Sequence, residues 1–473
     1  MLTPEQLTRL DQGMNPRGVA IIGATTEQHR VGYSVLESLL LGGYEGEIIP
    51  IHPRHETILG RRVYTSLAAA GLPVDLAVVA LNERATIDAM SDLGRQDVKV
   101  AVCVAGGYRE MGQSGTSLQV ALREAAERNN VLLIGPNTLG VMNGRIGLNA
   151  TFWPERLPGG GVVSVISQSG GVGQMIICQA QDQGLGINKW IGAGNRAALD
   201  FDSLVQYLGA DPTTSVIAVF IEGTELARPF VELAAQVDSQ KPVIVMKAGS
   251  SPRSQEAALT HTGSLAGSYK VYQDVFGQFG LLQAPNVNAL VSACKALALA
   301  PVPRGSRVGI LTPSAGPSIL LVDALAELGV EIGRFSPQML ERISGLFKNV
   351  PVVLKNPLDA AAVGYSADGY LTLADAILGD PAIDLLVAIN LDHKNRRFPA
   401  QELVDLSRQH GKPIVSLFIG HGARPFAYRE TCQAGGIPFF GTVEDAAWGV
   451  QGLVHRAIRG LAPNVSRSAD PRP

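Results

Sequence analysis

The 473-residue sequence predicts an α/β fold of three domains, each built on a parallel sheet. Short apolar runs of strand length alternate with helical stretches along the whole chain, which is the pattern of βαβ units. The 53 glycines suit many tight strand-to-helix turns. A chain of this length is too long for a single core, and 46% hydrophobic with 17% charged residues is the composition of a folded enzyme.

The first domain is expected over residues 1–145. Its first apolar run, 18–24, ends in glycine and is typical of a buried parallel strand followed by a phosphate-binding turn. The spacing of the next runs allows a helical crossover between successive strands, which predicts a doubly wound sheet. These further strands are expected at 46–51, 76–81, 98–104 and 131–134.

Two more alternations predict a second domain at 146–299 and a third at 306–462. A proline-containing linker, 298–305, marks the boundary between them. The last residues, 463–473, are polar and contain proline, so we expect a disordered tail. Strands are expected at 161–166, 189–191, 215–221 and 242–247 in the second domain, and at 307–312, 384–389 and 413–418 in the third.

Composition also excludes several classes of partner. The net charge of −3 and the lack of a Lys/Arg run argue against nucleic acid and anionic membranes. No apolar run reaches about 18 residues, and the first residues do not resemble an export signal. The four cysteines are far apart and fit no metal spacing, so we expect reduced thiols, no metal site and a cytoplasmic protein.

Glycine, proline and polar residues follow three strands of the first domain. The turn Gly23-Ala24-Thr25 lacks the full GxGxxG pattern, so a simple tight turn explains it as well as a nucleotide site does. Because the carboxyl ends of parallel strands form one crevice, we expect these three turns to converge on a ligand. The other two turns contain His52, Pro53 and Arg54, where Arg54 offers a cation for a phosphate, and Asn137 with Thr138.

In the second domain a strand runs into Ser169, Gly170 and Gly171 and then into a helical stretch. Such a turn aims backbone N–H groups and the positive end of a helix dipole at the loop, which suits phosphate. A serine cap without any ligand explains the same residues. Since glycine is missing two places before Ser169, the turn is not the nucleophile elbow of a hydrolase.

Glu222 and His261 are the candidate catalytic pair. Glu222 follows a strand and is expected at the same sheet edge as the Ser169 turn. His261 lies among small residues and hydroxyls, as expected of a mobile loop in which an imidazole carries a phosphoryl group. A carboxylate that holds one imidazole nitrogen leaves the other one able to attack phosphorus. Taken alone, each residue also has an ordinary interpretation: His261 as a surface histidine without a role, and Glu222 as an exposed glutamate at the end of a strand.

The ordered motifs resemble the alpha subunit of NDP-forming acyl-CoA synthetases, relatives of succinyl-CoA synthetase. The segment around His261 is the most specific of them. The resemblance covers roughly residues 15 to 450 and implies a Rossmann-like CoA-binding domain followed by two flavodoxin-like ligase domains. The matching segments are 18–24, 49–54, 135–137, 149–152, 167–170, 194–195, 222–223 and 261–267, with softer matches at 307–312, 356–359, 436–438 and 442–445.

The resemblance implies a reversible reaction in which acyl-CoA and phosphate give acyl phosphate and CoA. The phosphoryl group then moves to His261 and on to ADP, with Glu222 stabilising the phosphohistidine. Phosphate is expected at Ser169, Gly170 and Gly171. Coenzyme A is expected at Gly23, Ala24, Thr25, His52, Pro53, Arg54, Asn137 and Thr138.

No segment of ATP-grasp size follows the three predicted domains, so we expect ATP or ADP and Mg²⁺ on a separate ATP-grasp beta subunit in a hetero-oligomer. The sequence departs from the family where Thr138 replaces a common cysteine and Tyr269 a common aspartate, and in the turn 312–317. The acid, the choice between ADP and GDP and the physiological direction stay open, with acetate or a short monocarboxylate as the default.

Two other functions remain as alternatives. A non-catalytic or regulatory acyl-CoA-binding protein could use the same domains, although the presence of His261 favours an enzyme. A nicotinamide dehydrogenase requires a complete dinucleotide fingerprint with an acidic ribose ligand, and the glycine spacing does not supply it.

Overall fold

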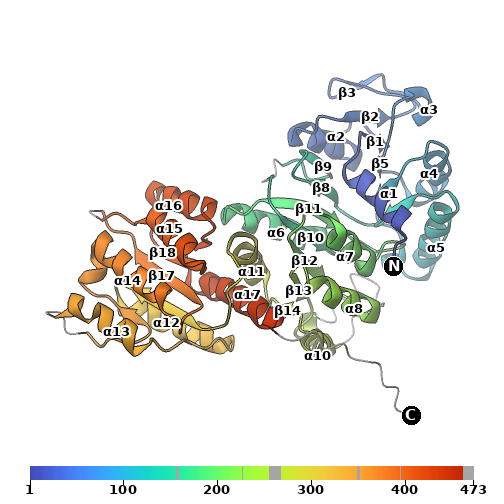
Figure 1. Cartoon of the computed structure of the whole chain (residues 1–473). Helices are drawn as coiled ribbons and strands as arrows, with labels where there is room; N and C mark the ends of the chain where they lie inside the picture. The colour runs from blue at the N-terminus through green and yellow to red at the C-terminus, as the bar shows by residue number, and fades with distance from the viewer. Residues whose placement is uncertain (156–158, 226, 255–267, 349–351, 395, 462–473) are drawn as a thin grey trace, which may run out of the picture. The chain divides into compact units, whose positions relative to one another are not determined.

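The computed structural model describes residues 1–155, 159–225, 227–254, 268–348, 352–394 and 396–461 (Figure 1). The chain divides into two compact units, residues 1–287 and 288–473. The domain limits 1–145, 146–299 and 306–462 remain predictions, and the predicted disordered tail lies outside the described residues. No helix in the described part of the chain has the length and apolar character needed to cross a membrane.

The first sheet of the first unit has five parallel strands in the order β2-β1-β5-β6-β7. All five lie where the sequence predicts strands. One face is covered by α3 (Leu67–Ala70), α4 (Glu83–Arg95) and α5 (Gln113–Arg128), and the other by α1 (Pro4–Met14) and α2 (Val31–Gly42). The strands are β1 (Gly18–Ile22), β2 (Glu47–Ile51), β5 (Leu76–Val79), β6 (Val100–Cys103) and β7 (Leu132–Ile134).

The second sheet of the same unit has the order β14-β13-β12-β10-β11-β8-β9. Four of its five parallel strands lie where strands are predicted, but the short parallel strand β14 at one edge and two antiparallel strands at the other were not anticipated. The antiparallel strands are β8 (Gly140–Asn143) and β9 (Leu148–Thr151), and β8 pairs with β11. The parallel strands are β10 (Val163–Ser167), β11 (Ile187–Gly192), β12 (Val216–Ile221), β13 (Val243–Lys247) and β14 (Leu282–Gln283).

One helix of the second sheet begins at its carboxyl edge, and three others pack an aromatic core. Helix α6 (Gly170–Asp182) follows β10, the strand at which the chain order reverses, so its N-terminus lies at the topological switch point. Three further helices, α7 (Phe201–Ala210), α8 (Ala227–Asp238) and α10 (Tyr269–Phe279), contribute Phe201, Phe230 and Phe276 to one core.

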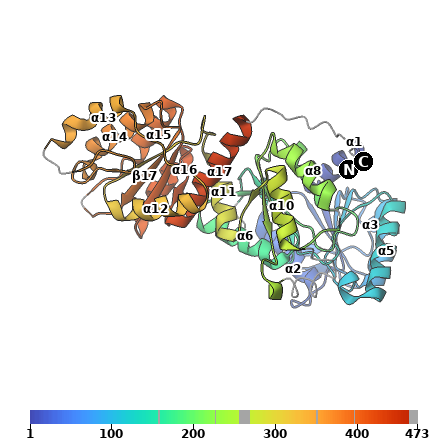
Figure 2. The ribbon, with the colours of Figure 1, turned by 90° about the horizontal axis from the view of Figure 1, so that it is seen from below.

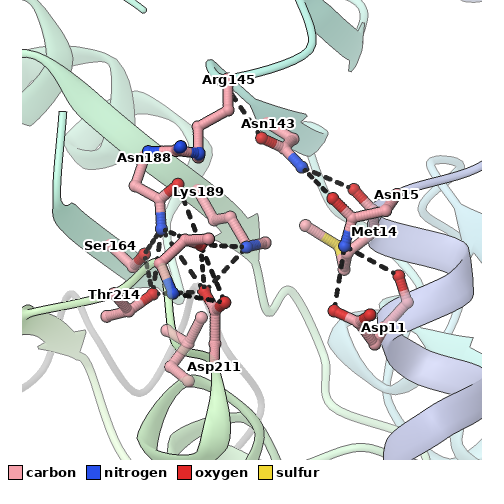
Figure 3. A network of polar contacts seen from close by, with 12 residues as sticks. Asp11, Met14, Asn15, Asn143, Arg145, Ser164, Asn188, Lys189, Asp211 and Thr214 are labelled. Carbon is pink, nitrogen blue, oxygen red and sulfur yellow. Dashed lines mark hydrogen bonds and ion pairs between the residues drawn. The ribbon is translucent and has the colours of Figure 1, made fainter. Parts of the chain in front are cut away.

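A buried polar network lies at the amino-terminal ends of β10, β11 and β12 (Figure 3). The Nζ of Lys189 on β11 lies 2.7 Å from an Oδ of Asp211, and both side chains are only 2% exposed. Asn188 donates to the hydroxyls of Ser164 and Thr214, at 3.2 and 3.0 Å. These bonds satisfy polar groups that would otherwise be costly to bury.

The second unit contains one sheet of five parallel strands in the order β16-β15-β17-β18-β19. Helices α13 (Pro337–Ser344), α14 (Ala367–Gly379), α15 (Ala400–His410) and α16 (Ala423–Ala434) cover one face, and α11 (Val287–Leu299), α12 (Ala315–Glu327) and α17 (Val443–Leu461) the other (Figure 2). The strands are β15 (Val308–Thr312), β16 (Leu358–Asp359), β17 (Leu385–Leu391), β18 (Ile414–Ile419) and β19 (Phe439–Phe440).

In two sheets, a bidentate arginine–aspartate pair lies at the start of a central strand. Arg17, just before β1, donates from Nε and Nη2 to both carboxylate oxygens of Asp75, at 2.9 and 2.8 Å. Arg307, just before β15, makes the same two bonds to Asp384, at 2.8 Å each. A planar guanidinium fits a carboxylate in this bidentate way, so each pair fixes two neighbouring strand starts.

Candidate functional site

A cavity of about 270 Å³ lies at the carboxyl edge of the second sheet, within the first unit. Residues that follow strands of the first sheet also contribute to the walls of this cavity. It is mostly polar, with apolar surface from Val104, Leu139 and Phe152. The remaining lining residues are Arg109, Asn137, Thr138, Gln168, Ser169, Gly170, Gly171, Gln174, Gly194, Asn195 and Glu222.

The N-terminus of α6 forms one wall of this cavity. Ser169 is its N-cap, and its hydroxyl accepts a hydrogen bond from the backbone N–H of Val172 at 3.4 Å. A Cβ at Gly170 would lie 3.1 Å from Leu139, whereas a Cβ at Gly171 would meet nothing within 4 Å. Packing therefore does not demand glycine at 171. The first N–H groups of a helix have no partner within the helix, so this wall offers donors to an anion.

Gln168 joins this helix to the neighbouring strand end. Its Oε1 accepts from the backbone N–H groups of Glu222, at 2.8 Å, and Gly223, at 3.2 Å. Its Nε2 is buried and has no hydrogen-bond partner within the part of the chain that the structure describes. The amide orientation follows from the two accepted bonds, and it leaves a donor at the cavity that a ligand oxygen can satisfy.

Glu222 lines the cavity at the end of β12, at the edge that the sequence predicts for it. Lys247 ends the adjacent strand, β13, and is the register partner of Ile221. Its Nζ lies 4.8 Å from the centre of the Tyr272 ring. Burial lowers the pKa of Lys247 to about 8, although the negative charge of Glu222 opposes the shift. A cation thus accompanies the carboxylate through most of the physiological pH range.

Arg109 reaches the cavity from the first sheet. It begins the short helix η1 (Arg109–Met111), which follows β6 after a pair of glycines. Its Nε and Nη2 are buried and make no hydrogen bond to any residue that the structure describes. Burial lowers the pKa of Arg109, and the charge of Arg196 lowers it further.

The next residue, Glu110, is fully engaged within the protein. It accepts bonds from the side chain of Asn195, at 2.6 Å, and from the backbone N–H groups of Gly107 and Tyr108. Burial on its own raises the pKa of Glu110, but these bonds together lower it. Glu110 is therefore an ionised structural group that orients Asn195 at the cavity wall.

A second cavity, of about 920 Å³, lies at the carboxyl edge of the first sheet. Six residues that the sequence analysis assigns to coenzyme A line it together: Gly23, Ala24, Thr25, His52, Pro53 and Arg54. Val104 lines both cavities. The two cavities are therefore neighbours at this residue.

The turn from β1 into α2 requires glycine at two places. Gly23 has a φ of 95°, which favours glycine. Gly32, in the first turn of α2, lies so close to this turn that a Cβ there would be 2.1 Å from the carbonyl oxygen of Gly23. The helix N-terminus is therefore pressed against the turn at the cavity wall, as in nucleotide-binding βαβ units.

His52 shapes the neighbouring turn. Its Nδ1 accepts from the backbone N–H groups of Arg54, at 3.2 Å, and His55, at 3.3 Å, and its ring stacks on His55 with centroids 4.3 Å apart. Burial lowers the pKa of His52, and the adjacent His55 and Arg54 lower it further. The ring is therefore neutral at pH 7, with its proton on Nε2.

The structure separates Asn137 and Thr138 from the other candidate coenzyme A residues, because both line the smaller cavity. The Thr138 hydroxyl is buried, donates to the carbonyl of Gly192 at 2.7 Å and accepts from the N–H of Gly140. Its polar group is therefore used within the protein. Asn137 has a φ of 56° and donates weakly to Asn195, at 3.4 Å.

His261 lies outside the described residues, so the structure gives no position for the predicted phosphoryl carrier. Among the described residues no group of three or more His, Cys, Asp or Glu side chains is arranged to hold a metal ion. The sequence analysis missed Arg109 and Gln168. Arg109 could have been found as a cation that follows two glycines at a strand's carboxyl end, and Gln168 as the residue between two turn serines.

Comparison with known proteins identifies the family. The CoA binding domain family matches residues 17–144, and the family described as succinyl-CoA ligase like flavodoxin domain matches residues 160–297. The chain is 34% identical over 459 residues to the alpha subunit of ADP-forming acetate–CoA ligase II of Pyrococcus furiosus, and the match covers 95% of this chain and 98% of that one.

Two further relatives agree with this assignment. The ADP-forming acetate–CoA ligase I of Archaeoglobus fulgidus is 33% identical over 427 residues, 90% of this chain but 60% of that longer protein. The solved structure of acetyl-coenzyme A synthetase 1 of Ca. Korarchaeum cryptofilum, in complex with phosphate and ADP, matches with a TM-score of 0.86 at 29% identity over 95% of this chain and 97% of the other. The chain therefore belongs to the alpha subunits of the ADP-forming acyl-CoA synthetases, which are acid–thiol ligases.

Proposed function

We propose that this chain exchanges the CoA of an acyl-CoA for phosphate and passes the phosphoryl group through His261 to ADP. Phosphate attacks the thioester carbonyl, the C–S bond breaks and CoA leaves, which gives acyl phosphate. An imidazole nitrogen of His261 then attacks phosphorus, and the free acid leaves. The observation that carries the proposal is the pair of cavities that share Val104, one suited to a long thiol ligand and the other to an anion.

Coenzyme A is proposed to lie in the larger cavity. Its pyrophosphate fits the turn Gly23-Ala24-Thr25 at the N-terminus of α2, where backbone N–H groups and the helix dipole favour negative charge. Arg54 supplies a side-chain cation at the same cavity. The thiol end then points past Val104, toward Asn137 and Thr138 in the smaller cavity.

Phosphate is proposed to lie at the N-terminus of α6, held by Ser169, Gly170 and Gly171. The Nε2 of Gln168, which has no partner among the described residues, supports this assignment, because a buried amide donor is costly unless a ligand satisfies it. Glu222 is proposed to hold one nitrogen of His261 while the other carries the phosphoryl group. Lys247 ends the strand next to that of Glu222, so a cation lies near this carboxylate.

The acid is proposed to be a short monocarboxylate, because relatives of this chain are named acetate–CoA ligases. An ATP-grasp beta subunit is proposed as the partner that binds ADP or ATP with Mg²⁺, since the related chain of Pyrococcus furiosus is named an alpha subunit. The cytoplasm is the proposed location, where CoA, phosphate and ADP are all available.

The test separates the two half-reactions. The chain alone is incubated with acetyl-CoA and labelled phosphate, and release of CoA thiol and acid-labile protein phosphate is measured. The wild type should accumulate both, whereas His261→Ala should lose protein phosphate and His393→Ala, a control outside the candidate residues, should retain it. Acid-labile phosphate that survives in His261→Ala would refute the phosphoryl carrier. A screen of acids with a reconstituted pair of subunits then identifies the substrate.

A further inference from the structure

We infer that Arg109 binds the phosphate or acyl phosphate in the smaller cavity, opposite the N-terminus of α6. The inference rests on the proposed function and adds a residue from the first sheet to a site otherwise built on the second. It assigns the ligand class as a multivalent oxyanion, held by a guanidinium on one side and by helix N–H groups on the other.

The unused hydrogen-bonding capacity of Arg109 is the first argument. Its side chain is 12% exposed, and Nε and Nη2, the two nitrogens that form one edge of the guanidinium, have no partner in the described part of the chain. Burying a guanidinium costs desolvation free energy, and without hydrogen-bond partners nothing offsets this cost. This edge has the geometry that binds two oxygens of a phosphate or carboxylate at once.

No carboxylate in the described part of the chain neutralises Arg109 closely. Glu225 lies 3.8 Å from its Nη1, which is beyond hydrogen-bond distance, and is 64% exposed, so solvent screens the pair. Asp200 accepts a 2.7 Å bond from Arg196. Glu110 is occupied by Asn195 and two backbone N–H groups. The charge of Arg109 is therefore available to a ligand.

The other walls of the cavity favour phosphate over a simple carboxylate. Gln168 contributes a second buried donor without a partner in the described ranges, and α6 contributes its first backbone N–H groups. The volume of about 270 Å³ is small beside the 920 Å³ of the larger cavity, so these donors line a space suited to a small ligand. Donors on several sides match the oxygens of a tetrahedral anion, whereas a planar carboxylate presents two oxygens in one plane.

The test measures binding of inorganic phosphate to the full chain by equilibrium dialysis. Arg109→Gln should weaken phosphate binding by about 10- to 100-fold, the usual effect of losing a charged hydrogen-bond partner. Arg109→Lys should recover part of the loss, because it restores the charge without the bidentate geometry. Arg123→Gln, on the surface of α5, is the matched control and should leave phosphate binding unchanged. The Kd for CoA should be the same in all four proteins, which also shows that the variants are folded.

The kinetic readout separates phosphate from the acyl group. With acetyl-CoA, Arg109→Gln should raise the KM for phosphate more than it lowers kcat. Unchanged phosphate binding in Arg109→Gln overturns the inference. A loss of activity confined to dicarboxylic acids such as malonate also overturns it, because Arg109 would then bind the acyl group and not phosphate. A wild-type chain that binds CoA and phosphate, together with an Arg109→Gln variant that binds phosphate equally well, overturns the inference alone, whereas a wild-type chain that binds CoA but no phosphate also contradicts the proposed phosphate site. One that binds neither overturns the proposed function with it.

Discussion

The buried pair of Lys189 and Asp211 allows a test of what stabilises the first unit. Asp211→Asn removes one charge and leaves Lys189 buried beside a neutral amide. The two side chains are 2% exposed, so water cannot replace the lost partner. Breaking a buried pair in this way costs about 3 to 5 kcal/mol of unfolding free energy. The surface variant Asp92→Asn, whose partner is Arg95 on the same helix, should change stability by less than about 0.5 kcal/mol.

The same pair predicts a dependence on pH. Burial on its own raises the pKa of Asp211, but bonds from Lys189, Thr214 and Thr213 outweigh it and lower the pKa to about 2. Because the folded-state pKa is depressed from 3.8, Asp211 contributes about 2 kcal/mol of stability above pH 4. That contribution is lost as the pH falls from about 4 to about 2, and Asp211→Asn should lose this part of the acid dependence.

The assay is urea unfolding followed by tryptophan fluorescence in a Trp448→Phe background. Trp153 and Trp190 then report on the first unit, and Trp190 lies next to Lys189 on β11. The double variant Lys189→Met with Asp211→Leu should be more stable than Asp211→Asn, because it leaves no buried charge. Equal unfolding free energies for the wild type and Asp211→Asn at pH 7 would refute the reasoning.

Three further predictions follow from other sites. Burial lowers the pKa of Lys295 to about 7, so between pH 7 and pH 9 the unfolded chain binds this proton more tightly than the folded chain. The free energy of unfolding of the second unit should therefore rise by about 2 kcal/mol over this range. Lys295→Met should remove this rise, as measured by calorimetric unfolding. Gly32→Ala should weaken CoA binding by at least about 10-fold, because its Cβ would collide with the Gly23 carbonyl, whereas Gly316→Ala has open space and should not; an equal Kd for both would contradict this. Arg54→Gln should weaken CoA binding and reduce its sensitivity to salt, measured by calorimetry at low and high ionic strength; an unchanged salt dependence would exclude a phosphate contact.

The regular part of the fold could be predicted because it follows from local pattern. The apolar runs that end at Gly23 and Ser167 predict buried parallel strands, and their turn residues predict where ligand-facing edges lie. The hairpin of β8 and β9 was missed although Asn143-Gly144 is a turn signal, because β9 (Leu148–Thr151) alternates apolar and polar residues and so contains no apolar run.

Other features could not be predicted because they depend on contacts between residues far apart in the sequence. The hydroxyl of Thr138 is occupied by the carbonyl of Gly192, 54 residues away, so its local motif cannot say that the group is already used. Arg109 likewise looks like an ordinary surface cation in the sequence. Only the folded structure buries it in the cavity that the N-terminus of α6 also lines, and leaves two of its nitrogens without a partner among the described residues.

The β8–β9 hairpin means that the CoA-binding part of the chain is not a detachable module. β8 begins two residues after Thr138, pairs with β11 and is covered by β9, which packs beside α2. Gly42 of α2 lies so close to this hairpin that a Cβ would be 2.5 Å from the carbonyl of Gly147. A chain cut at residue 145 would therefore divide the hairpin and leave the edge of β11 unpaired. Recombination between relatives should preserve this segment intact, and domain swaps should place their junctions after β9 rather than before it.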